Sequence, residues 1–319
     1  MTKLAKDSES SVANRFTRAV VFVNVHSGRG RSSKFLPRFG PVFRSHGISV
    51  ETIETSSAEE LTAHAKQQIG AGVRLFFSAG GDGTCQGLVN AVYGNDVVVG
   101  LIPAGGGNDF ARALGLPANP ISALHVGLAG EPRPVDLVKI VTADGRVRLY
   151  LGGGGIGLEA ATAQHASTRY RNWPGRLRYL AAAIRAYAAC EPSRIRITLE
   201  PAEGAAVWQS ALLASVLNTP TFGAGIRIAP TAKIDDGLLN LVLLDELRVG
   251  RLLLLLPRLA LRGTLNLPAL RTMTVRRLRI ETERPAMFEG DGELLGPTPV
   301  EIEVVPRAMQ FLAAKQAKR

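Results

Sequence analysis

A repeated alternation of apolar strands, glycine-rich loops and helices in the first third of the chain constrains the fold most. Apolar runs predict strands at residues 19–24, 49–55, 73–80 and 96–103. Helical patterns separate these runs, and a capping box, in which Glu60 follows Ser57 by three residues, marks the start of one helix. Because repeated strand–helix units form parallel sheets with helices on both faces, this region is predicted to be an α/β domain.

The pattern changes near residue 135, where an Asp-Gly turn joins two strand-like segments and many short strands follow. Short strands with frequent turns are typical of antiparallel sheets, so a C-terminal antiparallel β-sandwich domain is predicted. The predicted organisation is a disordered arm at 1–18, an α/β domain at 19–134, a β-rich domain at 135–306 and a C-terminal segment at 307–319 that packs back on the first domain.

Charge and composition narrow the choice of partner and compartment. The chain of 319 residues has a formal net charge of +11, which implies an anionic partner: nucleic acid, a nucleotide or an acidic membrane surface. Two cysteines do not make a disulfide framework and favour a reducing compartment. The most apolar stretch, 251–263, is broken by Pro257, and the polar N-terminus does not resemble a signal peptide. We therefore expect a cytoplasmic protein, either soluble or peripheral at the inner membrane face.

Three glycine-rich loops follow predicted strands: NVHSGRGR at 24–31, GGDGT at 80–84 and PAGGGNDFAR at 103–112. Open α/β sheets bind ligands at the carboxyl ends of their strands, and glycines there let backbone N–H groups approach a phosphate. Taken singly, Asp82 or Asp109 is explained as well by a helix cap or a tight turn. Together the loops predict a nucleoside triphosphate site, in which Asp82 can hold a Mg²⁺ ion that bridges phosphate oxygens.

The three loops and three downstream segments together resemble the diacylglycerol kinase catalytic-domain family. The downstream segments are GIGLEA at 155–160, APTAKIDDGLLNLVLL at 229–244 and EGDGELLG at 289–296, and the match runs in the family's order from about residue 19 to 312. The nearest relatives look like soluble bacterial lipid kinases, with sphingosine and ceramide kinases as more distant ones. The resemblance implies a fold similar to NAD kinases and diacylglycerol kinases, with a nucleotide-binding first domain and a lipid-substrate second domain.

What the resemblance implies for activity is transfer of the γ-phosphate of ATP to the hydroxyl of a lipid such as diacylglycerol, giving phosphatidic acid or a similar lipid phosphate. Asp82 matches the essential aspartate of the nucleotide loop and a metal ligand, Asp109 the acidic residue of the second loop, and Glu293 the general base. A second, structural Mg²⁺ would be held by Asp236 and by the backbone carbonyls of Lys233 and Leu238. Further nucleotide-binding positions carried over from the family are Asn24, Ser27, Gly28, Gly30, Gly80, Gly81, Gly83, Thr84, Gly105, Gly106 and Asn108.

The sequence departs from the family at three positions. Gly106 stands where the family usually has threonine, Val25 where it has proline, and Glu159 where it more often has aspartate. None of these changes removes a carboxylate with an implied catalytic role. The missing hydroxyl at Gly106 leaves open the preference for ATP over other nucleoside triphosphates.

Alternative functions differ in the features that they explain. A sphingoid-base or ceramide kinase would keep the same motifs, and an NAD kinase-like enzyme would share the GGDG loop but not PAGGGNDFAR. A non-catalytic lipid-binding regulator at the membrane would lose the carboxylates that this chain retains. Nucleic acid binding would explain the charge but none of the loops, so no nucleic acid partner is expected. A homodimer remains open.

A basic stretch suggests how the chain could meet a membrane. On a helix spanning Arg248–Arg262, four arginines would share one face and leucines would fill the rest. Such a helix suits an anionic membrane surface, but an ordinary surface helix with solvated arginines has the same pattern.

Overall fold

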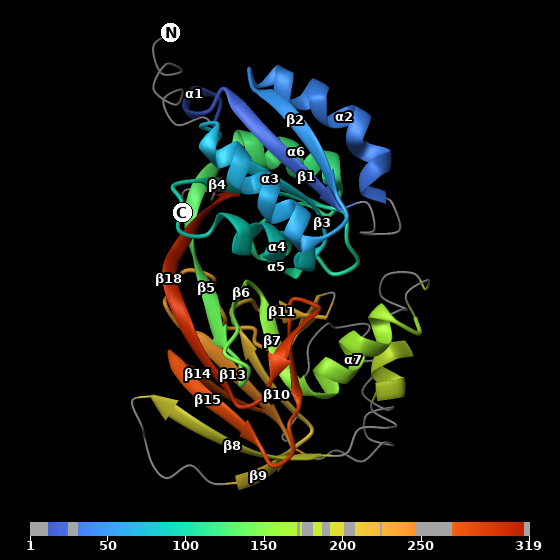
Figure 1. The fold of residues 1–319 in the computed structure, drawn as a ribbon, viewed down its shortest axis with the longest axis vertical. Helices are drawn as coiled ribbons and strands as arrows, with labels where there is room; N and C mark the ends of the chain where they lie inside the picture. The colour runs from blue at the N-terminus through green and yellow to red at the C-terminus, as the bar shows by residue number, and fades with distance from the viewer. Residues whose placement is uncertain are drawn as a thin grey trace. The chain divides into compact units, whose positions relative to one another are not determined.

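The computed structural model describes residues 12–24, 31–170, 173, 181–186, 192–200, 208–223, 225–245 and 270–315. The chain divides into two compact units, one made of Met1–Val135 with Ala308–Arg319 and the other of Asp136–Arg307 (Figure 1). The predicted disordered arm is too long at its C-terminal end, because Val12–Arg15 form helix α1 and Val12 is buried in the core of the first unit.

A parallel sheet forms the first unit. Its strands follow the order β2-β1-β3-β4, and the end of β18 extends it by pairing with β4 in the parallel direction at Gln310 and Phe311. The strands are β1 (Arg18–Asn24), β2 (Ser49–Thr55), β3 (Leu75–Gly80), β4 (Val98–Pro103) and β18 (Val300–Ala313). The helices are α2 (Arg31–Ser45), α3 (Ala58–Gly70), α4 (Asp82–Val92), α5 (Asp109–Ala113) and α6 (Pro120–Ala129).

The parallel sheet forms because its central strands are apolar on both faces. Every residue of β3 and of β4 is buried. On one face, alternate strand residues such as Val21 and Phe77 pack with Phe39 and Phe43 of α2 and with Leu124 of α6. Residues between them, such as Phe22 and Phe76, point to the other face, where their rings stack. Helices α3 and α4 contact each other as well as strands β2 and β3, respectively.

The second unit is built from antiparallel strands around its own core. A six-stranded sheet has the order β14-β13-β10-β7-β16-β17, while β15 pairs with β18 and β8, β8 with β9, and β5 with β6. A single apolar cluster, including Tyr150, Ile195, Leu241, Phe288 and Ile302, joins residues of both sets of strands. The predicted fold class, an α/β domain followed by an antiparallel β-sandwich, is confirmed.

The elements of the second part of the chain have these bounds: β5 (Glu131–Val141), β6 (Val147–Tyr150), β7 (Gly153–Gly157), α7 (Leu158–Ser167), β8 (Ser193–Glu200), β9 (Trp208–Ala211), β10 (Leu213–Leu217), β11 (Thr221–Phe222), β12 (Ile226–Arg227), β13 (Leu239–Leu244), β14 (Leu270–Val275), β15 (Arg277–Thr282), β16 (Met287–Gly290) and β17 (Glu293–Pro297). The sequence of 208–218 is one apolar run, typical of a single strand, but it forms two strands, β9 and β10, in different sheets. The break falls at Leu212, whose backbone bonds to Leu158 and Leu244.

Two of the predicted features lie outside the described residues. These are positions 27, 28 and 30 of the first glycine loop and the arginine- and leucine-rich stretch 248–262. Within the described part of the chain, no helix is both long and apolar enough to cross a membrane.

The C-terminal strand end should contribute strongly to the stability of the first unit. Phe311 is fully buried, and its ring meets that of Phe110 edge to face with the centroids 5.0 Å apart. Replacing Phe311 with alanine should lower the free energy of unfolding by about 3–5 kcal/mol, because it removes these contacts and leaves a cavity. Urea unfolding measures this change. The exposed control Lys315→Ala should change it by less than about 0.5 kcal/mol, and equal effects of the two variants would contradict the packing described.

Candidate active site

The glycine loops that follow β3 and β4 are in direct backbone contact with each other. Helix α4 begins at Asp82, two residues after the end of β3, with Gly81 as its N-cap residue. The N–H groups of Ala104 and Gly105 donate to the carbonyl oxygen of Gly80 at 2.8 and 3.1 Å. A side chain at Gly105 would place its Cβ 2.4 Å from the Gly81 Cα. The close approach of the two loops therefore explains why both contain glycine.

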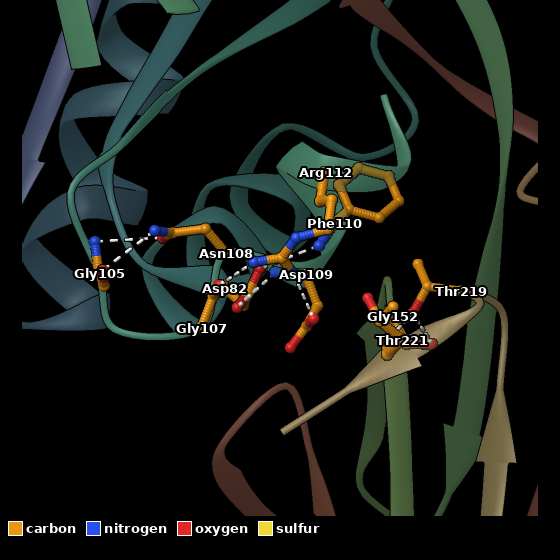
Figure 2. Close-up of polar contacts among 10 residues, drawn as sticks. All are labelled: Asp82, Gly105, Gly107, Asn108, Asp109, Phe110, Arg112, Gly152, Thr219 and Thr221. Atoms are coloured by element: carbon orange, nitrogen blue, oxygen red, sulfur yellow. Dashed lines mark hydrogen bonds and ion pairs between the residues drawn. The ribbon is translucent and has the colours of Figure 1, made fainter. Parts of the chain in front are cut away.

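Asp82 joins the glycine loop at 80–84 to the glycine loop at 103–112 (Figure 2). Its carboxylate accepts the backbone N–H groups of Asp109 and Phe110, each at 3.2 Å. Burial removes water from this carboxyl group and, with the nearby Asp109 carboxylate, raises the pKa of Asp82 from 3.8 to about 6. The structure thus brings together Asp82 and Asp109, two of the three residues predicted to be catalytic.

The loop after β4 is shaped by its own side chains. Asn108 adopts a left-handed backbone conformation, and its side-chain amide both accepts the N–H of Gly105 at 3.1 Å and donates to the Gly105 carbonyl oxygen at 3.0 Å. Asp109 is buried, and Arg112 folds back to pair with it (Figure 2). Arg112 belongs to the quoted motif, but the sequence alone gave it no role.

Another predicted nucleotide-binding side chain faces the protein interior. Thr84 is buried, and a Cβ at Gly80 would lie 2.4 Å from its Oγ1 atom, so glycine at that position leaves room for the threonine. Asn24, at the end of β1, donates to the same oxygen at 3.5 Å. These two residues therefore connect the ends of β1 and β3 beneath the glycine loops.

The GDGE segment, residues 290–293, joins β16 to β17 through a β-hairpin whose two turn residues are Asp291 and Gly292. Gly290 pairs with Glu293, and the residues between them, Asp291 and Gly292, have φ angles of 52° and 92°. Two consecutive residues with positive φ form the tight turn that suits right-twisted hairpins, and Asp-Gly is a preferred sequence for it. The hairpin fixes the backbone position of Glu293 as the first residue of β17.

Asp291 fastens this hairpin to the glycine run before β7. Its carboxylate accepts the N–H groups of Leu151, Gly152 and Gly153 at 2.6, 2.8 and 3.3 Å. The carbonyl oxygen of Gly152 is held in turn by the backbone and hydroxyl of the buried Thr219 (Figure 2). No role was predicted for Asp291, although its place in an Asp-Gly turn sequence was a detectable signal.

Glu293 itself lies in the second unit, whereas Asp82 and Asp109 lie in the first. The residue is exposed, but surrounding protein atoms withdraw water from its carboxyl group and raise its pKa above the ordinary value. A carboxylate with a raised pKa binds a proton more readily near neutral pH, which suits a general base.

The predicted second metal site is a turn in the second unit shaped by a buried aspartate. Asp136 accepts the N–H groups of Gly237 and Arg307 at 2.6 and 2.8 Å and donates its own N–H to Ile234. Asp236 accepts the N–H of Leu238 at 3.1 Å. Beside this turn is a cavity of about 530 Å³, lined by these acidic residues among others: Asp136, Asp235, Asp236 and Glu303. No role at this metal site was predicted for Asp136 from the sequence.

Carboxylate and carbonyl oxygens are the donors that Mg²⁺ prefers, so both predicted sites have the right chemistry. Among the described residues, no group of three or more His, Cys, Asp or Glu side chains is placed to hold a metal ion. A Mg²⁺ ion would therefore need further oxygens from backbone carbonyls, water or phosphate. That requirement matches the usual binding of Mg²⁺ through one or two carboxylates together with substrate phosphates.

Comparison with known families and proteins covers almost the whole chain. Residues 18–140 match the diacylglycerol kinase catalytic domain, and residues 154–313 match the YegS C-terminal NAD kinase beta sandwich-like domain. The chain is 28% identical to the diacylglycerol kinase of Mycobacterium tuberculosis (strain CDC 1551 / Oshkosh), over 92% of this chain and 94% of the relative. It is 31% identical to the "Probable lipid kinase YegS-like" of Stenotrophomonas maltophilia (strain K279a), over 83% and 86%.

A solved structure of a diacylglycerol kinase from Bacillus anthracis str. Sterne has the same fold. The superposition gives a TM-score of 0.69 at 22% identity, covering 94% of this chain and 97% of the other.

The raised pKa of Asp82 predicts how its effect on stability varies with pH. Between its ordinary pKa of 3.8 and its folded-state pKa of about 6, Asp82 holds a proton in the folded state that the unfolded state has released, so stability from this group falls as the pH rises. A shift of this size corresponds to roughly 3 kcal/mol. The unfolding free energy of the native protein minus that of Asp82→Asn should therefore fall by about this amount from pH 4 to pH 7.5. Urea unfolding of both proteins across this range tests the sign, and a constant or rising difference would contradict it.

Loss of the Asp291 carboxylate should loosen the hairpin. Asp291→Ala leaves three backbone N–H groups without this acceptor and should lower the unfolding free energy by about 2–4 kcal/mol. Asp291→Asn keeps one acceptor oxygen and tolerates a positive φ, so it should lose less. Chemical unfolding curves compare the two variants, and an asparagine variant as unstable as the alanine variant would argue against this ordering.

Proposed function

The chain belongs to the diacylglycerol kinase catalytic-domain family, and we propose that it is a lipid kinase that transfers the γ-phosphate of ATP to a lipid hydroxyl. Diacylglycerol is the proposed acceptor, and phosphatidic acid the product. One observation supports the proposal most directly: the Asp82 and Asp109 carboxylates lie together within two bonded glycine loops at adjacent strand ends. Such an arrangement suits a polyphosphate and its metal ion.

Each part of the proposed reaction is assigned to residues of this chain. The glycines of the loops, including Gly80, Gly81, Gly83, Gly105 and Gly106, let backbone N–H groups approach phosphate oxygens. Asp82 and Asp109 would hold Mg²⁺, which when bound neutralises charge on the phosphates. Glu293 would accept the proton of the lipid hydroxyl, and its raised pKa supports that role. Asp236, with the carbonyls of Lys233 and Leu238, would hold a second, structural Mg²⁺.

Other lipid alcohols are alternatives to diacylglycerol as the acceptor. A sphingoid base or ceramide would use the same groups, and Gly106 supplies no hydroxyl that would fix the preference for ATP. We place the reaction at an anionic membrane surface, in keeping with the net charge of +11. A lipid-binding protein without catalysis is disfavoured because Asp82, Asp109 and Glu293 are all present.

The decisive measurement is transfer of radiolabelled γ-phosphate from ATP to a panel of acceptors in mixed micelles with Mg²⁺. We expect labelling of one or more lipid alcohols, with diacylglycerol tested beside a long-chain base, ceramide and the soluble acceptor NAD. Labelling of NAD alone would favour an NAD kinase-like activity. Absence of labelling in every lipid, with the protein folded and nucleotide bound, would contradict the proposal.

Two variants test the assigned chemistry. Glu293→Gln keeps the size of the side chain but removes the proton acceptor, so kcat should fall by about 10²–10⁴-fold while the KM for ATP changes little. Asp82→Ala should abolish transfer because it removes both a charge and the bond to the second loop. Lys315→Ala, an exposed position, serves as the control and should keep full activity. Full activity in either of the first two variants would overturn the assigned mechanism.

A further inference from the structure

The Arg112 side chain lies over the second glycine loop (Figure 2). Its Nη1 atom is 2.6 Å from Asp109 Oδ1, and Nη2 donates a longer bond of 3.3 Å to the carbonyl oxygen of Gly107. The Asp109 side chain is only 10% exposed, whereas that of Arg112 is 43% exposed. Because the Arg112 side of this ion pair is open to solvent, the guanidinium can reach another anion without leaving a buried position.

The backbone that carries Arg112 is fixed although its side chain is exposed. Asp82 accepts the N–H groups of Asp109 and Phe110 at the start of α5. The N–H of Arg112 donates to the carbonyl oxygen of Asn108 at 3.1 Å. The guanidinium can therefore change partners by side-chain rotation alone, without movement of the loop.

The two carboxylates in the loops at 80–84 and 103–112 would repel a polyphosphate, so a positive charge is needed beside them. Residues 80–84 and 103–112 contain two acidic side chains, Asp82 and Asp109, and a single basic one, Arg112. A triphosphate that approaches two carboxylates in a partly buried site is repelled unless positive charge lies close by. A guanidinium also offers paired N–H donors in a planar fork, a geometry that matches two phosphate oxygens.

We propose that Arg112 is a phosphate-binding residue of the nucleotide site and that Asp109 holds it in place until a nucleotide binds. The ligand is the polyphosphate chain of a nucleoside triphosphate, and the guanidinium passes from Asp109 Oδ1 to phosphate oxygens. This inference rests on the proposed function, since it requires a nucleotide at the two loops. A divalent cation arriving with the nucleotide favours the same exchange, because it competes with Arg112 for the Asp109 carboxylate.

The test measures binding of ATP by isothermal titration calorimetry with no divalent cation added to the titration, so that none is supplied with the nucleotide. Arg112→Ala should weaken binding about tenfold or more, the usual effect of losing a hydrogen bond between charged groups. Asp109→Asn should tighten binding several-fold, because it releases Arg112 and removes a negative charge. In the Asp109→Asn background, Arg112→Ala should cost more affinity than it does in the native protein.

Control variants separate this role from a structural one. Arg44→Ala removes the same charge from an exposed position on α2 and should leave ATP affinity nearly unchanged. If Arg112 only oriented Asp109, its replacement would have no effect once Asp109 is asparagine, and that result would overturn the inference. Arg112→Lys keeps the charge without the fork and should bind with intermediate affinity. It decides the question if the alanine variant fails to fold, and native affinity in the lysine variant would also overturn the inference.

The same titrations test the proposed function and the role of Arg112 separately. A native protein that binds no ATP, with or without Mg²⁺, contradicts the proposed function itself. A native protein that binds ATP as tightly as Arg112→Ala does contradicts only the role given to Arg112.

Discussion

The carboxylate of Asp82 accepts two backbone N–H groups from a segment 27 and 28 residues further along the chain, and the candidate nucleotide site depends on these bonds. They hold the start of α5 against the start of α4, so both glycine loops keep one arrangement. The same bonds place the Asp109 carboxylate near that of Asp82. Loss of hydration on burial and, after it, repulsion by Asp109 raise the pKa of Asp82 to about 6. The hydrogen bonds that assemble the site therefore also place two carboxylates close together, and a nearby positive charge would stabilise their ionised forms.

Two aspartates of the second unit also accept backbone N–H groups from distant segments of the chain. Asp291 accepts the N–H groups of Leu151, Gly152 and Gly153, and Asp136 accepts those of Gly237 and Arg307. Of these donors, Leu151, Gly152 and Gly237 lie outside strands and helices, where a side-chain acceptor can satisfy a backbone N–H group. Irregular loops can then keep a single conformation, which a site that orients phosphates and metal ions requires. Asp136 is fully buried, and the hydrogen bonds that its carboxylate accepts offset the cost of removing it from water.

The fold could be predicted well because its signals are local. Apolar runs such as 19–24 and 96–103 gave the parallel strands, and the change of pattern near residue 135 gave the antiparallel region. The errors also have local causes. The break at Leu212 divides one apolar run between two sheets, and no turn residue in the sequence marks it. The prediction of a disordered arm missed α1, because Val12 is ordered by contacts with a core that is formed elsewhere in the chain.

For the candidate site, the sequence by itself determined which chemical groups are present: the glycines of three loops, the carboxylates of Asp82, Asp109 and Glu293, and the turn that holds Asp236. These follow from residue type and short spacing. Only the tertiary structure decided that Asp82 bonds to the second loop, that Asp291 and Asp136 support distant turns, and that Arg112 rests on Asp109. The physical reason is that a hydrogen bond between segments far apart in sequence depends on how the sheets pack, and no local pattern encodes that packing.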